Sequence, residues 1–211
     1  MEMLFRTGSQ YVGMCEAFLK YPNVQDMFEV ASEILQYDLK HFVHWTQRRP
    51  GSAIFCQSAV FLTSLAAVEK LREENPKAIE NCVAAAGFSV GEFAALVFAG
   101  ALSFEDAVFL IQVRAEAMQR ASEMVKTGML SVVAETRHDT ITSARRRPHT
   151  AKTMALDFIQ ERAKDFSLKL TRRLPVSGAF HTSFMEPAEE KFGKALEEVT
   201  LEEPLIQFIQ T

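Results

Sequence analysis

The sequence has few cysteines, no long apolar run and no excess of positive charge, and each absence narrows the function. Its 211 residues include only three cysteines, Cys15, Cys56 and Cys82. These form neither a metal-ligand spacing nor an even-numbered disulfide framework, so we expect no metal site and a reducing compartment. The formal net charge of -4 gives no general attraction to nucleic acid. No apolar stretch approaches the roughly 20 residues of a membrane span, which predicts a soluble protein.

The N-terminal segment also lacks the features of a targeting sequence. MEMLFRTGSQ has neither a secretory apolar region nor an Arg/Ser-rich amphipathic leader, so we expect any transit peptide to be already absent from this chain. With 48% hydrophobic and 24% charged residues, the chain can bury a sizeable core as one domain, or as one domain plus a lobe.

Helical and strand-like segments alternate along the chain. Apolar periodicity predicts helices over 25–36, 57–74, 90–99, 103–125 and 153–166, and a last helix from about Glu186. Short runs predict strands over 82–86, 129–133 and 168–176. This alternation indicates the α/β class. Residues 134–150, with Arg145, Arg146 and Arg147 in succession, are predicted to be a solvated loop rather than a dedicated anion site.

A serine between two glycines follows the predicted strand at 82–86. The segment GFSVG, residues 87–91, has the spacing of a tight strand-to-helix turn that exposes a serine hydroxyl. The glycines let neighbouring backbone approach without Cβ clashes. Ser89 is therefore a candidate nucleophile. The alternative is a turn of small residues that happens to contain a serine.

A serine nucleophile needs a base, and the chain has five histidines. His181 lies on a loop between a predicted strand and a predicted helix, where catalytic groups are often held. The other four, at 41, 44, 138 and 149, lie in irregular or basic segments and are compatible with surface positions. On sequence alone, a lone histidine such as His181 is more often structural or solvent-facing than catalytic.

Several segments together resemble one enzyme family. GFSVGEFAALVFAGALSFEDAVFLIQVRAEAMQ, GMLSVV and RRLPVSGAFHTSFMEPA occur in that order, and GSQYVGM and CQSAVFLTSLAAVEKLREE precede them. This combination resembles the malonyl-CoA:acyl carrier protein transacylase family over nearly the whole chain outside 135–150. Phe88, where bacterial members usually have histidine, is similar to the animal mitochondrial form. The chain is shortened internally and at both ends relative to that form.

The resemblance implies a fold and two subdomains. The fold is α/β, with an α/β-hydrolase-like acyltransferase subdomain at 1–127 and 175–211 and a small ferredoxin-like subdomain at 128–174. The second subdomain is reduced and the first is truncated at its C-terminal end.

The resemblance also implies the catalytic residues. Ser89 matches the nucleophile that takes the malonyl group from CoA, and His181 matches the base. The Val90 N–H matches one oxyanion donor, and aligning the GSQ segment places the Thr7 N–H as the second.

Two further residues match substrate-binding positions. Arg114 matches the arginine that holds the malonyl carboxylate, for which a planar guanidinium gives two parallel hydrogen bonds. Without the resemblance, Arg114 would be one more polar residue on a solvated helix face. Gln57 matches a position that lines the family's pocket.

The family relationship implies partners and a location. The acceptor is the phosphopantetheine thiol of acyl carrier protein, no cofactor is bound, and the enzyme is a monomer of the mitochondrial matrix. Lys169, Arg172 and Arg173 form a basic strip that would attract an acidic carrier. The alternative is that these cations only solubilise a strand edge.

Three departures from the family pattern bear on activity. Only MEML precedes FRTG, so we expect much of the first strand to be missing. The segment after 133 is short, so we expect the lid of the acyl pocket to be incomplete. The chain stops at Thr211, before the family's group that orients the histidine, so the residue that orients His181 is not identified.

These departures leave two hypotheses of different classes. The first is an acyltransferase, an S-malonyltransferase of fatty-acid biosynthesis. The second is a non-catalytic remnant that binds acyl carrier protein or CoA without turnover. A third, a serine esterase, is disfavoured by Arg114 and by the lack of a persuasive acidic triad member.

Overall fold

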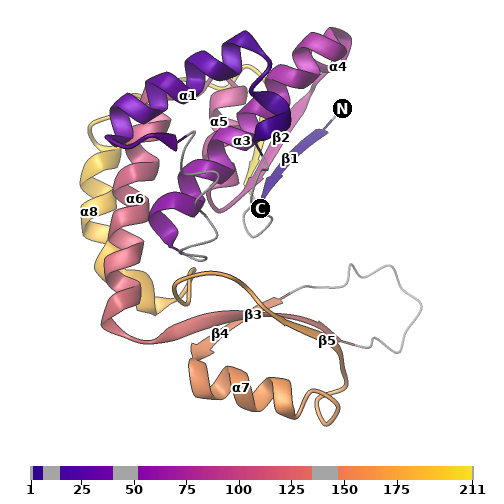
Figure 1. The fold of residues 1–211 in the computed structure, drawn as a ribbon, viewed down its shortest axis with the longest axis vertical. Helices are drawn as coiled ribbons and strands as arrows, with labels where there is room; N and C mark the ends of the chain where they lie inside the picture. The colour runs from indigo at the N-terminus through magenta and orange to yellow at the C-terminus, as the bar shows by residue number, and fades with distance from the viewer. Residues whose placement is uncertain (1, 7–14, 40–51, 135–146, 211) are drawn as a thin grey trace. The chain divides into compact units, whose positions relative to one another are not determined.

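The chain folds into two compact units. The computed structural model describes residues 2–6, 15–39, 52–134 and 147–210 (Figure 1). Unit 1 comprises Met1–Glu116 and Lys191–Thr211, and unit 2 comprises Ala117–Glu190. Helices α6 (Phe104–Met124) and α8 (Glu186–Leu196) contribute residues to both units. The mixture of helices and strands agrees with the predicted α/β class.

Unit 1 contains a parallel sheet in the order β1-β2-β6. Its strands are β1 (Glu2–Arg6), β2 (Ala84–Phe88) and β6 (Gln207–Gln210). β1 pairs with β2 from Glu2 opposite Ala84 to Arg6 opposite Phe88. Much of the first strand was expected to be missing, but β1 is present and pairs with β2 along the whole length of β2.

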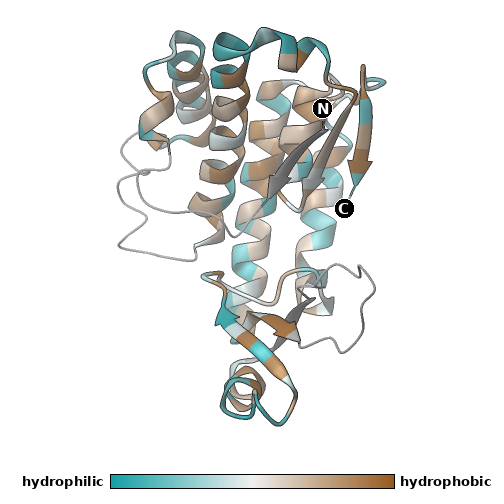
Figure 2. Cartoon of the chain, turned by 90° about the vertical axis from the view of Figure 1, so that its right-hand side faces the viewer, coloured by the Kyte–Doolittle hydropathy of each residue, from teal (hydrophilic) through white to brown (hydrophobic). Residues whose placement is uncertain are grey.

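Helices cover this sheet in successive layers. α5 (Gly91–Phe98) packs on β1 and β2, α3 (Ala53–Glu74) on α5, and α1 (Pro22–Leu35) on α3. The short elements η1 (Glu16–Phe18) and α4 (Pro76–Glu80) flank α3. The helices carry both hydrophobic and hydrophilic residues, as expected when one face is buried (Figure 2). Phe28, Phe61 and Leu110 are almost completely buried between them.

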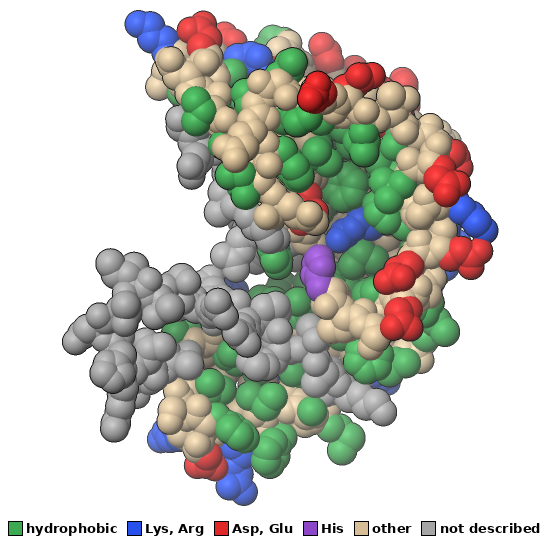
Figure 3. Space-filling model, turned by 180° about the vertical axis from the view of Figure 1, so that it is seen from behind, with side chains coloured by type: hydrophobic (Ala, Val, Ile, Leu, Met, Phe, Trp, Pro, Cys, Tyr) green, Lys and Arg blue, Asp and Glu red, His purple; other side chains and the backbone are tan. Residues whose placement is uncertain are grey.

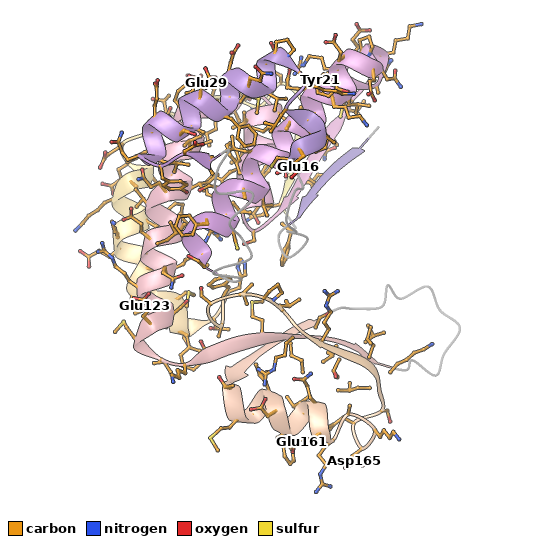
Figure 4. The ribbon with its side chains drawn as sticks, in the orientation of Figure 1. Glu16, Tyr21, Glu29, Glu123, Glu161 and Asp165 are labelled. Atoms are coloured by element: carbon orange, nitrogen blue, oxygen red, sulfur yellow. The ribbon has the colours of Figure 1, made fainter. Side chains whose placement is uncertain are left out.

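Polar contacts at the surface tie α1 to α3. The Tyr21 hydroxyl donates to the Glu74 carboxylate over 2.7 Å, and the Asn23 amide donates to Glu69 over 2.9 Å. Tyr21 is labelled at this end of the unit in Figure 4. Acidic side chains gather on the outer surface of unit 1 (Figure 3). The hydrogen bonds of Tyr21 and Asn23 are exposed and contribute little to stability compared with the buried core.

α3 is long and apolar enough to cross a membrane by length and composition alone. An 18-residue window of this 22-residue helix has a mean hydropathy of 1.4. This finding corrects the prediction that no apolar stretch approaches that length. Half of the window is buried inside the structure, as is usual for a core helix of a globular domain.

The predicted signals around α5 and α6 are confirmed. Gly100, which follows α5, has a φ of 74°, the left-handed conformation that a helix C-terminus often needs. The Asp106 N–H donates to the Ser103 hydroxyl over 3.0 Å, so Ser103 caps α6 as predicted.

Unit 2 contains an antiparallel sheet in the order β4-β3-β5 with α7 on one face. The elements are β3 (Thr127–Ala134), β4 (Arg147–Lys152), α7 (Thr153–Glu161), β5 (Leu168–Arg173) and η2 (Ser183–Met185). Leu130, Val132 and Leu156 form a buried cluster between the sheet and α7. A second cluster of unit 2 consists of Ala117, Met118, Ala121, Met185 and Ala188. The predicted loop at 134–150 is wrong at both ends, because β3 continues to Ala134 and β4 begins at Arg147. Arg145 and Arg146 lie outside the described residues.

Arg173 fastens β5 to α7. Its guanidinium donates to the Gln160 amide oxygen over 2.8 Å and to the Thr153 carbonyl over 3.1 Å, and it pairs with the Asp157 carboxylate. Arg172, the preceding residue of the strand, is exposed. The two arginines of the predicted basic strip therefore differ, because Arg173 already has partners within unit 2.

Candidate active site

Ser89 occupies a tight turn between β2 and α5. β2 ends at Phe88 and α5 begins at Gly91, so only two residues connect them. Ser89 has a φ of 59°, a left-handed conformation that residues with a Cβ rarely adopt. A Cβ on Gly87 would lie less than 3.0 Å from backbone atoms of Gly91 and Glu92. The first glycine is therefore required by the close approach of the helix, as the motif predicted.

Hydrogen bonds from Glu92 hold both peptide groups of Ser89. The Glu92 N–H donates to the Ser89 carbonyl over 3.1 Å. The Ser89 N–H donates to the Glu92 carboxylate oxygen Oε1 over 3.3 Å. Among the turn and cap hydrogen bonds of the described residues, none uses the Val90 N–H as donor. Val90 is itself completely buried, and its role as an oxyanion donor stays a prediction.

Arg114, from α6, contacts the candidate nucleophile directly. Its Nη2 donates to the Ser89 Oγ over 3.1 Å, and its Nη1 donates to the side-chain oxygen of Gln57. The guanidinium carbon lies 5.9 Å from the centre of the Phe93 ring. Gln57 and Ser89 are buried, with 4% and 7% of their surface exposed. The structure thus brings together three of the predicted site residues: Ser89, Arg114 and Gln57.

The environment of Arg114 is poorly hydrated. Arg114 keeps some exposed surface, but desolvation of the guanidinium lowers its pKa to about 10, opposed by the negative charge of Glu92. The group therefore remains a cation at neutral pH. A cation that has already lost much of its hydration is well suited to bind a carboxylate.

His181 lies in a turn of unit 2. It is exposed and has a φ of 59°, and it follows Ala179, whose N–H donates to the Thr127 hydroxyl over 2.9 Å. The Thr182 hydroxyl donates to the Ala179 carbonyl over 2.6 Å. These bonds fix the chain on both sides of His181. Because Ser89 belongs to unit 1, the pairing of the two residues stays a prediction.

The remaining predicted positions fall outside this description. Thr7, the proposed second oxyanion donor, lies outside the described residues, as do His41, His44 and His138. Within the described ranges there is no group of three or more His, Cys, Asp or Glu side chains able to hold a metal ion.

Sequence reasoning missed two neighbours of the site, Glu92 and Phe93. A signal for Glu92 was present, because a serine followed three residues later by glutamate at a helix start is a capping-box pattern. The three-residue spacing between Ser89 and Glu92 fits this pattern. Phe93 offers no comparable signal, since an aromatic residue in a helix is usually a core residue.

Comparison with known proteins places this site in a family. Residues 7–211 match the acyl transferase domain model. The human mitochondrial malonyl-CoA-acyl carrier protein transacylase is 43% identical over 225 aligned positions, which cover 94% of this chain and 58% of the human protein. The chain thus spans less than two thirds of the length of this relative.

Solved structures show the same fold. The malonyl CoA-acyl carrier protein transacylase of Coxiella burnetii matches with a TM-score of 0.83 and 28% identity, covering 99% of this chain and 71% of that one. A malonyl-transacylase in complex with its type II PKS acyl-carrier protein matches with a TM-score of 0.79 and 26% identity, covering 99% and 73%. The chain therefore belongs to the acyl transferase domain family, and its predicted resemblance to the malonyl-CoA:acyl carrier protein transacylases, including the mitochondrial form, is confirmed.

Proposed function

We propose that the chain transfers a malonyl group from malonyl-CoA to the phosphopantetheine thiol of acyl carrier protein, in fatty-acid biosynthesis. The observation that carries the proposal is the Arg114 Nη2 at 3.1 Å from the Ser89 Oγ. This contact puts a cation beside the candidate nucleophile. An acyl group that is bound to Ser89 and ends in a carboxylate would have its negative charge close to this cation. An esterase for neutral acyl groups would gain nothing from this arrangement.

The first half-reaction forms an ester on Ser89. The Ser89 Oγ attacks the thioester carbonyl while His181 accepts its proton. The N–H groups of Val90 and Thr7 stabilise the negative charge that develops on the carbonyl oxygen. The C–S bond breaks, and the CoA sulfur leaves with the proton that His181 returns. The malonyl carboxylate binds the Arg114 guanidinium, whose Nη1 stays bonded to Gln57 while Nη2 releases the Ser89 Oγ as the ester forms.

The second half-reaction runs the same steps toward the carrier. His181 accepts the proton of the phosphopantetheine thiol, and the sulfur attacks the Ser89 ester. The C–O bond breaks, and Ser89 regains its proton from His181. No cofactor is needed, because both steps exchange one acyl linkage for another.

The context of the reaction follows from the mitochondrial relatives. We propose that the enzyme acts as a monomer in the mitochondrial matrix. We also propose that the acyltransferase subdomain comprises 1–127 and 175–211 and that the small ferredoxin-like subdomain comprises 128–174. Lys169 and Arg172, both exposed on β5, are the members of the basic strip available to an acidic carrier.

Labelling with malonyl-CoA that carries a radioactive malonyl group tests the reaction. Wild-type protein should retain label through a stable adduct, and Ser89→Ala should retain none while keeping its helical circular dichroism. Transfer of the label to added acyl carrier protein would complete the cycle. Folded wild-type protein that takes up no label would instead support the remnant, which binds carrier or CoA without turnover.

A further inference from the structure

Ser89 is held from two sides by oppositely charged side chains. The Glu92 carboxylate accepts the Ser89 N–H at 3.3 Å, and the Arg114 guanidinium donates to the Ser89 Oγ at 3.1 Å. One contact acts on the backbone of the serine and the other on its hydroxyl. The proposed function assigns a role to Arg114 but none to Glu92.

The backbone of Ser89 requires such support. Its φ of 59° is disfavoured for a residue with a Cβ and persists only when the surroundings determine it. Glu92 binds the peptide groups on both sides of the serine, through its backbone N–H on the Ser89 carbonyl and its carboxylate on the Ser89 N–H. Because these two groups flank the φ and ψ rotations of Ser89, one residue constrains both.

The N–H groups of Ser89 and Val90 therefore have different roles in this turn. Glu92 occupies the Ser89 N–H and leaves the Val90 N–H for another acceptor. If the Ser89 N–H lost its acceptor, the turn could relax from the left-handed conformation. The hydroxyl and the Val90 N–H would then move relative to each other, although attack and oxyanion stabilisation need both in fixed positions.

We propose that Glu92 is a positioning residue for Ser89: its carboxylate holds the Ser89 N–H and so fixes the strained turn that aims the hydroxyl and the Val90 N–H. This role rests on the proposed function, in which Ser89 carries the acyl group. Glu92 touches neither substrate nor reacting atom. Through this hydrogen bond Glu92 acts on the rate of attack at Ser89, while its charge also acts on Arg114, to which the choice between acyl groups belongs.

Two variants of Glu92 separate the hydrogen bond from the charge. Glu92→Ala removes the acceptor, whereas Glu92→Gln keeps an acceptor oxygen at the same position without the charge. Glu105 provides the matched control, because it is also a glutamate in the first turn of a helix of unit 1 and is exposed. Glu105→Ala should behave as wild type in every measurement.

The first measurement is amide hydrogen exchange at Ser89, followed by NMR. Glu92→Ala should accelerate exchange at this amide by at least about tenfold, since the N–H loses its acceptor, and Glu92→Gln should restore most of the protection. This measurement needs no substrate. Unchanged protection in Glu92→Ala would overturn the proposal whether or not the protein is a transacylase.

The second measurement is the rate of covalent modification of Ser89. Neither Glu92→Ala nor Glu92→Gln keeps the charge that acts on Arg114, so the comparison of these two variants isolates the hydrogen bond. With malonyl-CoA and with acetyl-CoA, Glu92→Ala should be slower than Glu92→Gln by the same factor, and slower than wild type by on the order of 10- to 100-fold. A fluorophosphonate, which needs no carboxylate site, should show the same order of rates. A malonyl-to-acetyl ratio that differs between Glu92→Ala and Glu92→Gln would overturn the proposal. Failure of wild type to react with malonyl-CoA, with the fluorophosphonate order intact, would refute only the proposed function.

Discussion

Replacing Arg114 should change which acyl group the enzyme prefers. In the proposed complex the malonyl carboxylate lies against a guanidinium that is already desolvated, as its pKa of about 10 reflects. Loss of one partner of such a pair costs about 3 kcal/mol, or roughly 150-fold in kcat/KM for malonyl-CoA. Acetyl-CoA lacks the carboxylate and should lose only the contribution of the hydrogen bond to Ser89, about tenfold or less. Arg114→Ala should therefore lower the malonyl-to-acetyl ratio by roughly 15- to 150-fold.

The assay is the rate of Ser89 acylation from each CoA thioester, measured by rapid quench at several concentrations. Arg114→Lys is the informative companion, because it keeps a cation but cannot contact Ser89, Gln57 and a carboxylate with one planar fork. It should give an intermediate ratio. Thermal unfolding of each variant checks that the fold survives. Equal losses for malonyl-CoA and acetyl-CoA would refute the reasoning and would assign Arg114 to Ser89 alone.

Three further predictions follow from other parts of the structure. Gly87→Ala should destabilise unit 1 by about 1 to 3 kcal/mol in thermal unfolding and abolish acylation, since the added Cβ would meet backbone atoms. Gly193→Ala should instead stabilise the protein by about 0.4 to 1 kcal/mol, because no atom lies within 4 Å of the added Cβ. Arg173→Ala should destabilise unit 2 by about 1 kcal/mol in urea titration, and Arg172→Ala by under about 0.5 kcal/mol. Burial raises the pKa of Cys15 from 9.0 to about 11, so at pH 8 its thiolate fraction should be about 100-fold below that in urea. Because the thiol is also shielded from the reagent, its alkylation by iodoacetamide should be slower than in urea by at least that factor. Equal effects within any of these pairs of variants or conditions would contradict the corresponding argument.

The parts of the fold that could be predicted are those whose cause is local. α1, α3 and α6 follow from apolar periodicity, and the ends of α5 and the start of α6 follow from Gly100 and Ser103. Each signal lies within a few residues of the structure it determines. Periodicity in a short window is therefore enough to find these helices.

The strands that were not predicted depend on distant partners. β4, with the sequence RPHTAK, has no apolar alternation and is a strand because it pairs with β3 from Arg147 to Lys152. β1 and β6 are five and four residues long and are defined by pairing with β2, more than 75 positions away. A short segment without a pattern gives no local sign of such pairing.

The residues of the candidate site also differ in whether the local sequence indicates them. Ser89 was found from its own turn, because the glycine spacing and the left-handed backbone are one local feature. Arg114 and Gln57 were found only through the family resemblance. An arginine at position 114, on a helix with polar neighbours, is predicted to be solvated. Nothing in the local sequence indicates that its guanidinium contacts a serine 25 residues earlier and a glutamine 57 residues earlier.

In the proposed reaction, Arg114 donates to two partners in sequence. In the free protein its Nη2 donates to the Ser89 Oγ, and its Nη1 is held by Gln57. Formation of the proposed ester makes that oxygen a weaker acceptor, because its electrons are shared with the new carbonyl. The same reaction delivers a carboxylate three carbons along the acyl chain, a far stronger acceptor for the same donor. Gln57 keeps the guanidinium in place while Nη2 exchanges one oxygen for the other. The guanidinium is therefore desolvated when the chain folds, before the acyl group binds. In the proposed reaction the malonyl carboxylate then binds a donor that is already oriented.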